Sequence, residues 1–234
     1  MMPFSALRLR HSATGGATDP FWSSVTSLLH FDGTDASTTF TDVKGKTWMG
    51  SGNAQLDTSF SRWGTGALLL DGSGDYISTA HSSDFTPDVD FTFECWVRTQ
   101  NIGSIRVIAT KRGSSTGWQF QIDSSGAISV NFWGTYAGGV AAATTVATLS
   151  INTWYHVAFT QTGGTWRVFV DGVLSATASP AGTHTASTTP LALGYDQIAL
   201  SRFFIGHIDD VRVTRGVARY TSNFTPPSAA LPDS

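Results

Sequence analysis

The sequence has 234 residues, a length at which an all-β sandwich commonly forms a single domain. Its net charge is −3 and its Lys and Arg residues are scattered, which excludes the basic surface that nucleic-acid binding requires. Charged residues make up 13% of the chain, which is about half of the ~25% usual in globular proteins. The surface must therefore be built from Ser, Thr, Gly and Asn, a composition that suits a virion or extracellular surface.

Residues 1–24 are polar and rich in Gly and Thr. They contain no apolar run long enough for a secretory signal, and no run in the sequence is long enough for a membrane-spanning helix. We therefore expect synthesis in a host cytoplasm without export. We interpret residues 1–24 as an N-terminal arm that is either a disordered tail or a segment that orders on a neighbouring subunit. In the second case its apolar anchors would be Phe4, Leu7, Leu9, Phe21 and Trp22.

From Val25 onward, short runs of alternating apolar and polar residues predict β-strands. The run SLLHF ends at a turn at Asp32-Gly33, and the run ALLL leads into the tight loop DGSGD. In FTFECWVR (residues 91–98) every second residue is apolar, which predicts a long core strand with Cys95 as a buried, unpaired thiol. The runs IRVIATK, WQFQI and AISVNFW predict further strands.

Three runs between Trp154 and Ala178 are separated by Gly163-Gly164 and Asp171-Gly172. These pairs supply the positive φ angles of tight hairpin turns, so the stretch predicts an antiparallel meander. Residues 134–148 are mostly small, and we expect a long loop between sheet edges there. The run RFFIGHIDDVRVT predicts a closing strand, and the prolines of residues 223–234 predict a C-terminal strap that cannot pair.

Evenly spaced strands with Gly and Asp turns predict an all-β fold of two antiparallel sheets, a sandwich or jelly roll, over residues 25–222. Five stretches resemble the laminin G-like branch of the concanavalin A-like lectin/glucanase jelly rolls: LLHFDG, ALLLDGSGDYIS, FTFECWVR, WYHVAFTQTGGTWRVFVDG and FFIGHIDDVRVTRGVARYT. The resemblance implies one concave and one convex sheet. The opening DPFWSSVTSLLHFDG also resembles such domains in tailed-phage structural proteins.

Glycosidases with this fold hold two carboxylates ~5–5.5 Å apart, usually on a strand that reads Glu-x-Asp-x-x-Glu. The sequence has a single glutamate, Glu94, and no such motif. Asp209 and Asp210 are neighbours on an expected strand, so they would face opposite sides unless a bulge intervenes. Asp88 and Asp90 share a face but fall in a turn. The sequence therefore predicts a protein that is not an enzyme.

Calcium is the candidate cofactor, because the resemblance implies a structural ion beside the Asp of the closing strand and the N-terminal strand. The positions that correspond are Asp32 and Asp209, with Asp71 and Asp75 as weaker candidates in their Gly-rich loop. The alternative is that Asp32 and Asp71 only cap turns with the glycines that follow them.

Carbohydrate binding, which the resemblance implies for a non-catalytic member, needs aromatic platforms beside polar groups. The candidate platforms are Trp118, Trp133, Tyr136 and Tyr195, which lie in or beside expected loops. Core or interface packing is the alternative role for each of them.

We therefore expect a non-enzymatic phage virion structural protein, which would be a decoration, fibre or tail component. Its arm would bind other virion proteins or a second copy of the chain, and its loops would bind host glycans. Nucleic acid and membrane are not expected partners. The alternatives are a stand-alone carbohydrate-binding module and, third, a glycoside hydrolase of the same fold.

Overall fold

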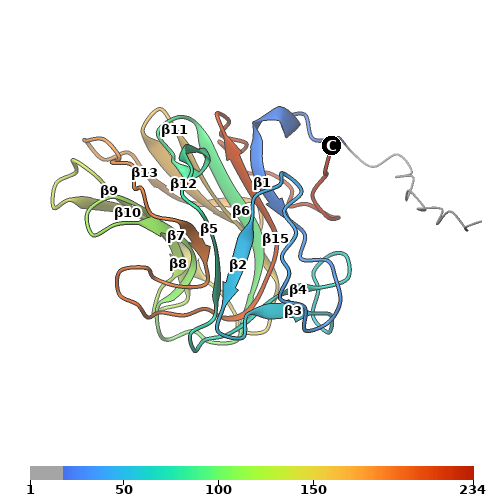
Figure 1. Ribbon diagram of the computed structural model, residues 1–234. Coiled ribbons are helices and arrows are strands. Elements are labelled where there is room, and N and C mark those ends of the chain that lie inside the picture. Colours follow the sequence, from blue (N-terminus) through green and yellow to red (C-terminus); the bar gives the residue numbers. More distant parts are fainter. Residues whose placement is uncertain (1–17) are drawn as a thin grey trace, which may run out of the picture.

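The computed structural model describes residues 18–234, which form a sandwich of two antiparallel β-sheets (Figure 1). The elements in chain order are η1 (Trp22–Ser24), β1 (Val25–Leu29), β2 (Trp48–Ser51), β3 (Gln55–Asp57), β4 (Ala67–Asp71), β5 (Tyr76–Thr79), η2 (Ser83–Phe85), β6 (Phe91–Thr99), β7 (Arg106–Arg112), β8 (Gly117–Ile122), β9 (Ala127–Trp133), β10 (Val140–Thr148), β11 (Tyr155–Thr162), β12 (Thr165–Val170), β13 (Val173–Ala178), β14 (Leu191–Leu193) and β15 (Ile205–Arg215). The predicted all-β jelly-roll architecture is confirmed. Over this range no helix has the length and apolar character needed to cross a membrane.

The first sheet has the order β13-β12-β11-β6-β15-β4-β3, and the predicted meander is its β11-β12-β13 edge. The second sheet has the order β10-β9-β8-β7-β14-β5-β2. Strand β15 is long enough to change partners along its length: residues 205–208 pair with β4, and residues 211–214 pair with β1. The change occurs at a bulge around Asp210, which has a φ of 51°.

The core between the sheets is strongly aromatic. Phe93 from β6 packs against Phe159 from β11 with ring centroids 5.9 Å apart, and Trp118 from β8 lies 5.0 Å from Phe159. Cys95 is fully buried in the same cluster, as the alternation in residues 91–98 predicts. Large aromatic side chains dominate core energetics, so this cluster fixes how the two sheets pack.

The outer face of the first sheet carries a buried network of charges. The guanidinium of Arg212 donates from Nε and Nη2 to Glu94 Oε1, at 3.0 and 2.8 Å, and from Nη1 to Asp19 Oδ2 at 2.9 Å. The other carboxylate oxygen of Glu94 contacts His156 Nε2 at 3.1 Å and accepts from the Tyr220 hydroxyl at 2.8 Å. Residues before β1 and after β15 thus close over this face.

Two expectations about chain organisation are wrong. Residues 140–148, expected in a loop, form β10, which pairs with β9 at the edge of the second sheet. The small Ala and Thr side chains show no clear apolar alternation, so the sequence pattern did not indicate a strand. Strand β10 is held by its backbone pairing with β9. The boundary at residue 25 is also too late, because Asp19 is buried and its N–H donates to the carbonyl of Ser234 at 2.8 Å, so the described N-terminal end meets the C-terminus (Figure 1).

Candidate functional site

A row of small and polar residues crosses the outer face of the second sheet. Strand register aligns Ser78, Ala192, Thr110, Gln119 and Asn131 side by side on β5, β14, β7, β8 and β9. Their neighbours along each strand point into the core, so these residues point outward. Thr110 and Gln119 are nevertheless buried, at 0% and 1% exposure. Neighbouring segments therefore shelter the middle of this face.

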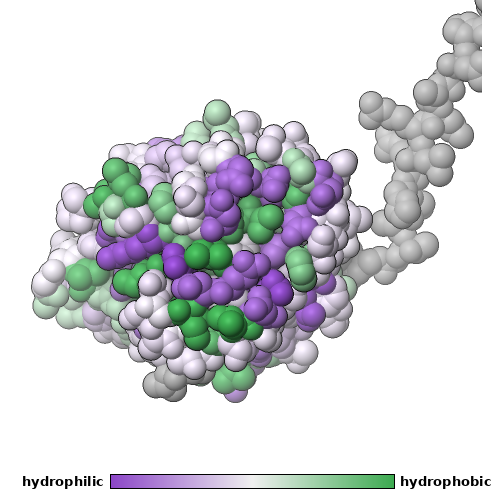
Figure 2. Space-filling view, turned by 90° about the horizontal axis from the view of Figure 1, so that it is seen from below, coloured by the Kyte–Doolittle hydropathy of each residue, from purple (hydrophilic) through white to green (hydrophobic). Residues whose placement is uncertain are grey.

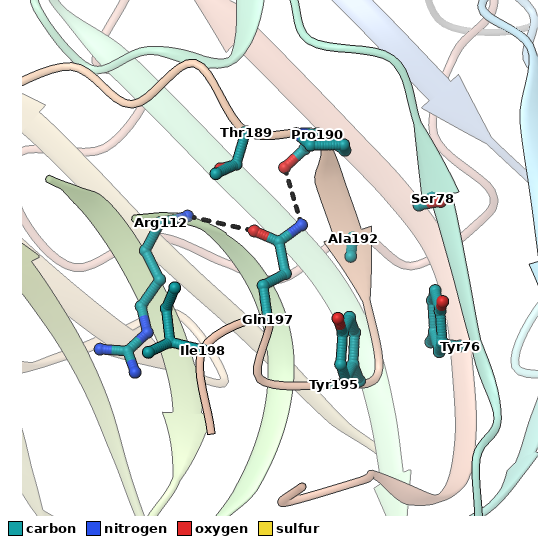
Figure 3. Close-up of a pocket in the computed structure, with 9 residues that line it drawn as sticks. All are labelled: Tyr76, Ser78, Arg112, Thr189, Pro190, Ala192, Tyr195, Gln197 and Ile198. Carbon is teal, nitrogen blue, oxygen red and sulfur yellow. Dashed lines mark hydrogen bonds between the residues drawn. The ribbon is translucent and has the colours of Figure 1, made fainter. Parts of the chain in front are cut away.

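A pocket of about 290 Å³ opens at one end of this row (Figure 3). Side chains from β5, β7 and β14 form its base, and the loop after β14 forms its side. The residues that line it are Tyr76, Ser78, Arg112, Thr189, Pro190, Ala192, Tyr195, Gln197 and Ile198. Its volume lies just below the range for small-molecule sites, about 300–1,000 Å³, so it suits one or two sugar residues.

The loop that closes the pocket is anchored by the buried carboxylate of Asp196. One of its oxygens accepts from the N–H groups of Ile198 and Ala199, at 3.0 and 3.1 Å. The carboxylate also pairs with the guanidinium groups of Arg112 and Arg202, both at 3.1 Å. With two arginines and one aspartate, this edge of the pocket carries a net positive charge.

The polar groups inside the pocket are partly fixed by the backbone. Gln197 donates from Nε2 to the carbonyl of Pro190 at 2.9 Å, and its Oε1 accepts from the Arg112 N–H at 3.4 Å (Figure 3). The opposite wall is held by buried Lys111, whose ammonium donates to the carbonyls of Ser187 and Thr189 at 2.5 and 3.0 Å. Burial lowers the pKa of Lys111 to about 8. These bonds preorganise the pocket walls.

Aromatic rings line the other side of the pocket. Tyr195 stacks on Tyr76 with centroids 4.2 Å apart, and its other neighbour, Phe203, lies 5.7 Å away in a nearly parallel plane. Both ring faces of Tyr195 are thus covered, and it offers its edge and hydroxyl rather than a stacking platform. Burial raises the pKa of Tyr195, which keeps its hydroxyl protonated as a donor.

Trp133 lies beyond Arg112 on the same face. The Arg112 guanidinium sits 4.4 Å from the centre of the Trp133 ring, a cation–π contact. Gly117 lies between them in the sheet register, and because it has no side chain, Arg112 can reach across to Trp133. The half-buried Trp133 thus extends the site from the pocket across the sheet.

The other two predicted platforms lie elsewhere. Trp118 is fully buried and donates from Nε1 to the carbonyl of Phe85 at 2.9 Å, so the prediction that it stacks a sugar is wrong. Tyr136 is 7% exposed and lines a different pocket. Sequence reasoning missed Tyr76, Arg112 and Gln197, because only the insertion of β14 between β5 and β7 brings them together.

The candidate calcium ligands Asp32 and Asp209 both hold the loop between β3 and β4. Asp209 Oδ2 accepts from the N–H groups of Arg62 and Trp63 at 2.7 and 3.1 Å, and Asp32 Oδ1 accepts from the Thr65 hydroxyl at 3.0 Å. Nowhere in residues 18–234 do three or more His, Cys, Asp or Glu side chains form a group suited to a metal ion. Calcium binding stays a prediction.

The weaker calcium candidates, Asp71 and Asp75, shape their own loop. Asp75 accepts from the N–H groups of Asn53 and Asp71 at 2.7 and 3.1 Å, and Asp71 accepts from the Ser73 N–H at 2.7 Å. Burial, together with the charge of Asp71, raises the pKa of Asp75 although both N–H groups oppose the rise. These contacts are those of turn capping.

The lower end of the molecule has a mixed surface. Figure 2 shows several separate hydrophobic clusters there, with hydrophilic side chains between them. Such a face lacks the continuous apolar patch that marks many docking surfaces, so the pocket on the second sheet remains the better candidate site.

Comparisons with known proteins agree with this fold. Residues 71–218, more than half of the chain, match the Laminin_G_3 family, described as the concanavalin A-like lectin/glucanases superfamily. No curated protein matches the sequence.

Solved structures with a similar fold include three toxin binding domains, each about twice the length of this chain. The botulinum neurotoxin serotype D binding domain has a TM-score of 0.63 and 16% identity, over 88% of this chain and 50% of that one. The binding domain of Paraclostridial Mosquitocidal Protein 1 has a TM-score of 0.63 and 14% identity, over 91% and 51%. The binding domain of botulinum neurotoxin DC in complex with SialylT has a TM-score of 0.62 and 15% identity, over 91% and 50%.

At these identities the similarity to the toxins is one of fold, whereas the family match rests on the sequence itself. The chain belongs to the concanavalin A-like lectin/glucanase superfamily.

Proposed function

We propose that this protein is a non-catalytic carbohydrate-binding protein and that the pocket beside Tyr76 and Tyr195 is its glycan site. The observation that carries the proposal is the pocket itself, in which aromatic rings, hydroxyls and a fixed amide converge on the outer face of the second sheet. Sugars present apolar ring faces and polar edges, and this mixture of groups complements both. One of the similar toxin domains was solved in complex with SialylT, which supports a glycan as the ligand proposed for this chain.

The state of the chain's single glutamate supports a binding role over catalysis. Both carboxylate oxygens of Glu94 are engaged by Arg212, His156 and Tyr220, and the residue is fully buried. Glu94 is therefore not free to protonate or attack a glycosidic bond, which a retaining or inverting glycosidase requires of a carboxyl group.

A glycan array with the full chain tests the proposal, followed by titration calorimetry on the best ligand. Tyr76→Ala and Gln197→Leu should each weaken binding about tenfold, the effect of losing one or two hydrogen bonds and their contacts. Met49→Ala is the matched control, because Met49 is 70% exposed on the same sheet and does not line the pocket. Binding that survives both pocket variants would contradict the site, and a blank array would contradict the function.

Where this protein acts is a finer proposal, which rests on its sequence. We place it in a tailed-phage particle as a decoration, fibre or tail component, because its opening residues resemble such proteins and its surface carries little charge. Of the proposed anchors, Phe4, Leu7 and Leu9 lie outside the described residues. Trp22 packs inside the domain against Val25, Leu28 and Leu231. Phe21 is 40% exposed and remains a candidate anchor, together with the residues before Asp19.

A further inference from the structure

A second pocket, of about 250 Å³, lies between the β11–β12 hairpin, the segment before β6 and the connection that precedes β14. It shares no lining residue with the pocket on the second sheet. The residues that line it are Pro87, Asp88, Tyr136, Gln161, Gly164, Trp166, Gly182, Thr183 and His184.

One wall of this pocket is locked in place by backbone contacts. His184 forms a β-bridge with Gly134, and Thr135 and Thr183 exchange two hydrogen bonds of 2.9 Å. Gly182 has a φ of 128°, and a Cβ there would lie 2.9 Å from the Tyr136 ring. Only glycine fits this close approach, so the position of His184 is preorganised.

The floor of the pocket is aromatic and rigid. Trp166 stacks on Phe132 with centroids 3.9 Å apart, and Tyr136 meets the edge of Phe132 at 5.3 Å. The ring of His184 lies edge-on to Trp166 at 5.7 Å. A ligand that enters would therefore meet an apolar base.

Three polar atoms of the pocket have no hydrogen-bond partner within residues 18–234. They are the two ring nitrogens of His184 and the Oε1 of Gln161. All three atoms are buried, and none makes a hydrogen bond of ordinary geometry to the described residues. Burial lowers the pKa of His184 to about 4, while the Asp88 carboxylate and the Trp133 carbonyl oppose this only weakly. The ring is neutral at pH 7, so one nitrogen donates and the other accepts.

The charge of the pocket narrows the ligand class. Among the described residues, no Lys or Arg lines the pocket, which disfavours an anion. The carboxylate of Asp88, which does line it, is paired with Arg215 at 2.8 Å. The groups that remain are one neutral donor and two acceptors. They match adjacent hydroxyl groups, each of which can donate and accept at once.

We propose that this pocket binds a small neutral polyhydroxyl compound, either the end residue of a glycan or a free polyol, through hydrogen bonds to His184 and Gln161. Ligand hydroxyls pair the imidazole nitrogens and the amide oxygen, and the carbon skeleton rests on the Trp166 and Tyr136 side. The pocket is smaller than the usual range of about 300–1,000 Å³ for small-molecule sites, which limits the occupant to about one sugar ring.

Nuclear magnetic resonance of the histidine side chains tests this directly. The ¹⁵N signals of the imidazoles are followed in the full chain during titration with glucose, galactose, N-acetylglucosamine and glycerol, and His184→Phe assigns the His184 signals. We expect a saturable shift of the His184 signals. A response to a sugar but not to glycerol identifies a glycan end, and a response to glycerol identifies a polyol site.

Two variants and one control complete the test. Gln161→Leu should weaken binding about tenfold, as should His184→Phe, which keeps an aromatic ring on Trp166; should that variant not fold, Gln161→Leu decides alone. Gln197→Leu, in the other pocket, should leave the His184 response unchanged. No saturable shift with any of the four probes, or a response that Gln197→Leu alone abolishes, would overturn the proposal. Because the full chain carries both pockets, Tyr76→Ala and Gln197→Leu on one side and Gln161→Leu on the other assign any glycan-array signal to one pocket or the other.

Discussion

Glu94 shares its carboxylate among a guanidinium, an imidazole and a phenol, all on the outer face of the first sheet. Burial alone would raise the pKa of Glu94, but the charge of Arg212 and the contacts with His156 hold it well below its ordinary value. A carboxylate with a lowered pKa stabilises the fold above the pKa it has when unfolded, and this stabilisation is lost as the pH falls toward the folded value.

Glu94→Gln should therefore destabilise the protein at neutral pH by about 3–5 kcal/mol, because it leaves a buried guanidinium without its charge partner. Urea unfolding measures the change. Asp88→Asn is the control: its ion pair with Arg215 is largely solvent-exposed, so its loss should cost less than about 1 kcal/mol. If both variants lose the same free energy of unfolding, burial does not make the Glu94 ion pair more important for stability than the exposed pair.

The pKa of Asp209 is shifted in the opposite direction to that of Glu94. Burial raises its pKa from 3.8 to about 7, although the N–H groups of Trp63 and Arg62 lower it in part, and Asp210 adds to the rise. A carboxyl with a raised pKa favours the folded state fully below its unfolded pKa, and this contribution disappears as the pH rises through the folded value.

Asp209→Asn should therefore be more stable than the wild type at pH 8, by at most about 4 kcal/mol from a shift of roughly three pKa units. At pH 3, below the unfolded pKa of 3.8, the wild-type carboxyl is neutral in both the folded and the unfolded state, and the two proteins should be nearly equal. Thermal melts at both pH values, with Ca²⁺ and with a chelator, measure this. A stabilisation by Ca²⁺ that Asp209→Asn removes would establish the calcium site, and an unchanged melting temperature would count against it.

At the scale of elements, alternation and turn residues were enough to predict the meander and the long core strand. The same alternation in WQFQI places Trp118 with Phe120 inside and Gln119 outside, so the sequence did contain the signal against Trp118 as a platform. The bulge at Asp210 could not be predicted, because it depends on β15 changing partners from β4 to β1. The pocket on the second sheet was missed for a related reason: long-range strand order assembles it.

The C-terminal strap is part of the domain's structure. Phe224 stacks on Tyr220 with centroids 3.5 Å apart, and its N–H donates to the carbonyl of Gly172 in the β12–β13 turn at 2.8 Å. A Cβ on Gly172 would lie 2.0 Å from the Phe224 carbonyl, so the turn and the strap fit only with glycine there. Further along, the Leu231 N–H donates to Asp210 Oδ2 at 2.7 Å.

Phe224→Ala should lower the free energy of unfolding by about 2 kcal/mol, less than the 3–5 kcal/mol of a fully buried phenylalanine, because this side chain is only half-buried. Truncation after Ser222 should cost more, since it also removes Leu231. Chemical denaturation of both forms gives these values, with Thr225→Ala as an exposed neighbour for comparison. A truncated form as stable as the full chain would show that the strap contacts the sheet without stabilising the fold.

At the scale of the molecule, the N-terminal residues from Asp19 onward are part of the folded domain. The Asp19 side chain is 6% exposed and pairs with both Arg212 and Arg219, at 2.9 and 2.6 Å. Burial would raise the pKa of Asp19, but the Arg219 hydrogen bond and both guanidinium charges lower it overall. Removal of residues 1–17 should therefore leave the melting temperature unchanged. Removal of residues 1–24 should lower it by many degrees, because two buried arginines lose a partner. Calorimetry of the three forms distinguishes the two segments.

Light scattering of the full chain and of the form without residues 1–17 then tests whether the arm assembles the protein. The shorter form keeps Asp19 and Trp22, so a change in its size reflects lost assembly rather than lost folding. We expect an oligomer for the full chain and a monomer for the shorter form, because the proposed anchors Phe4, Leu7 and Leu9 would bind a neighbouring subunit. The triple variant of these residues to Ser should behave as the shorter form does. If every form is monomeric, the arm does not drive self-assembly, and the stand-alone glycan-binding module becomes the better account of the whole molecule.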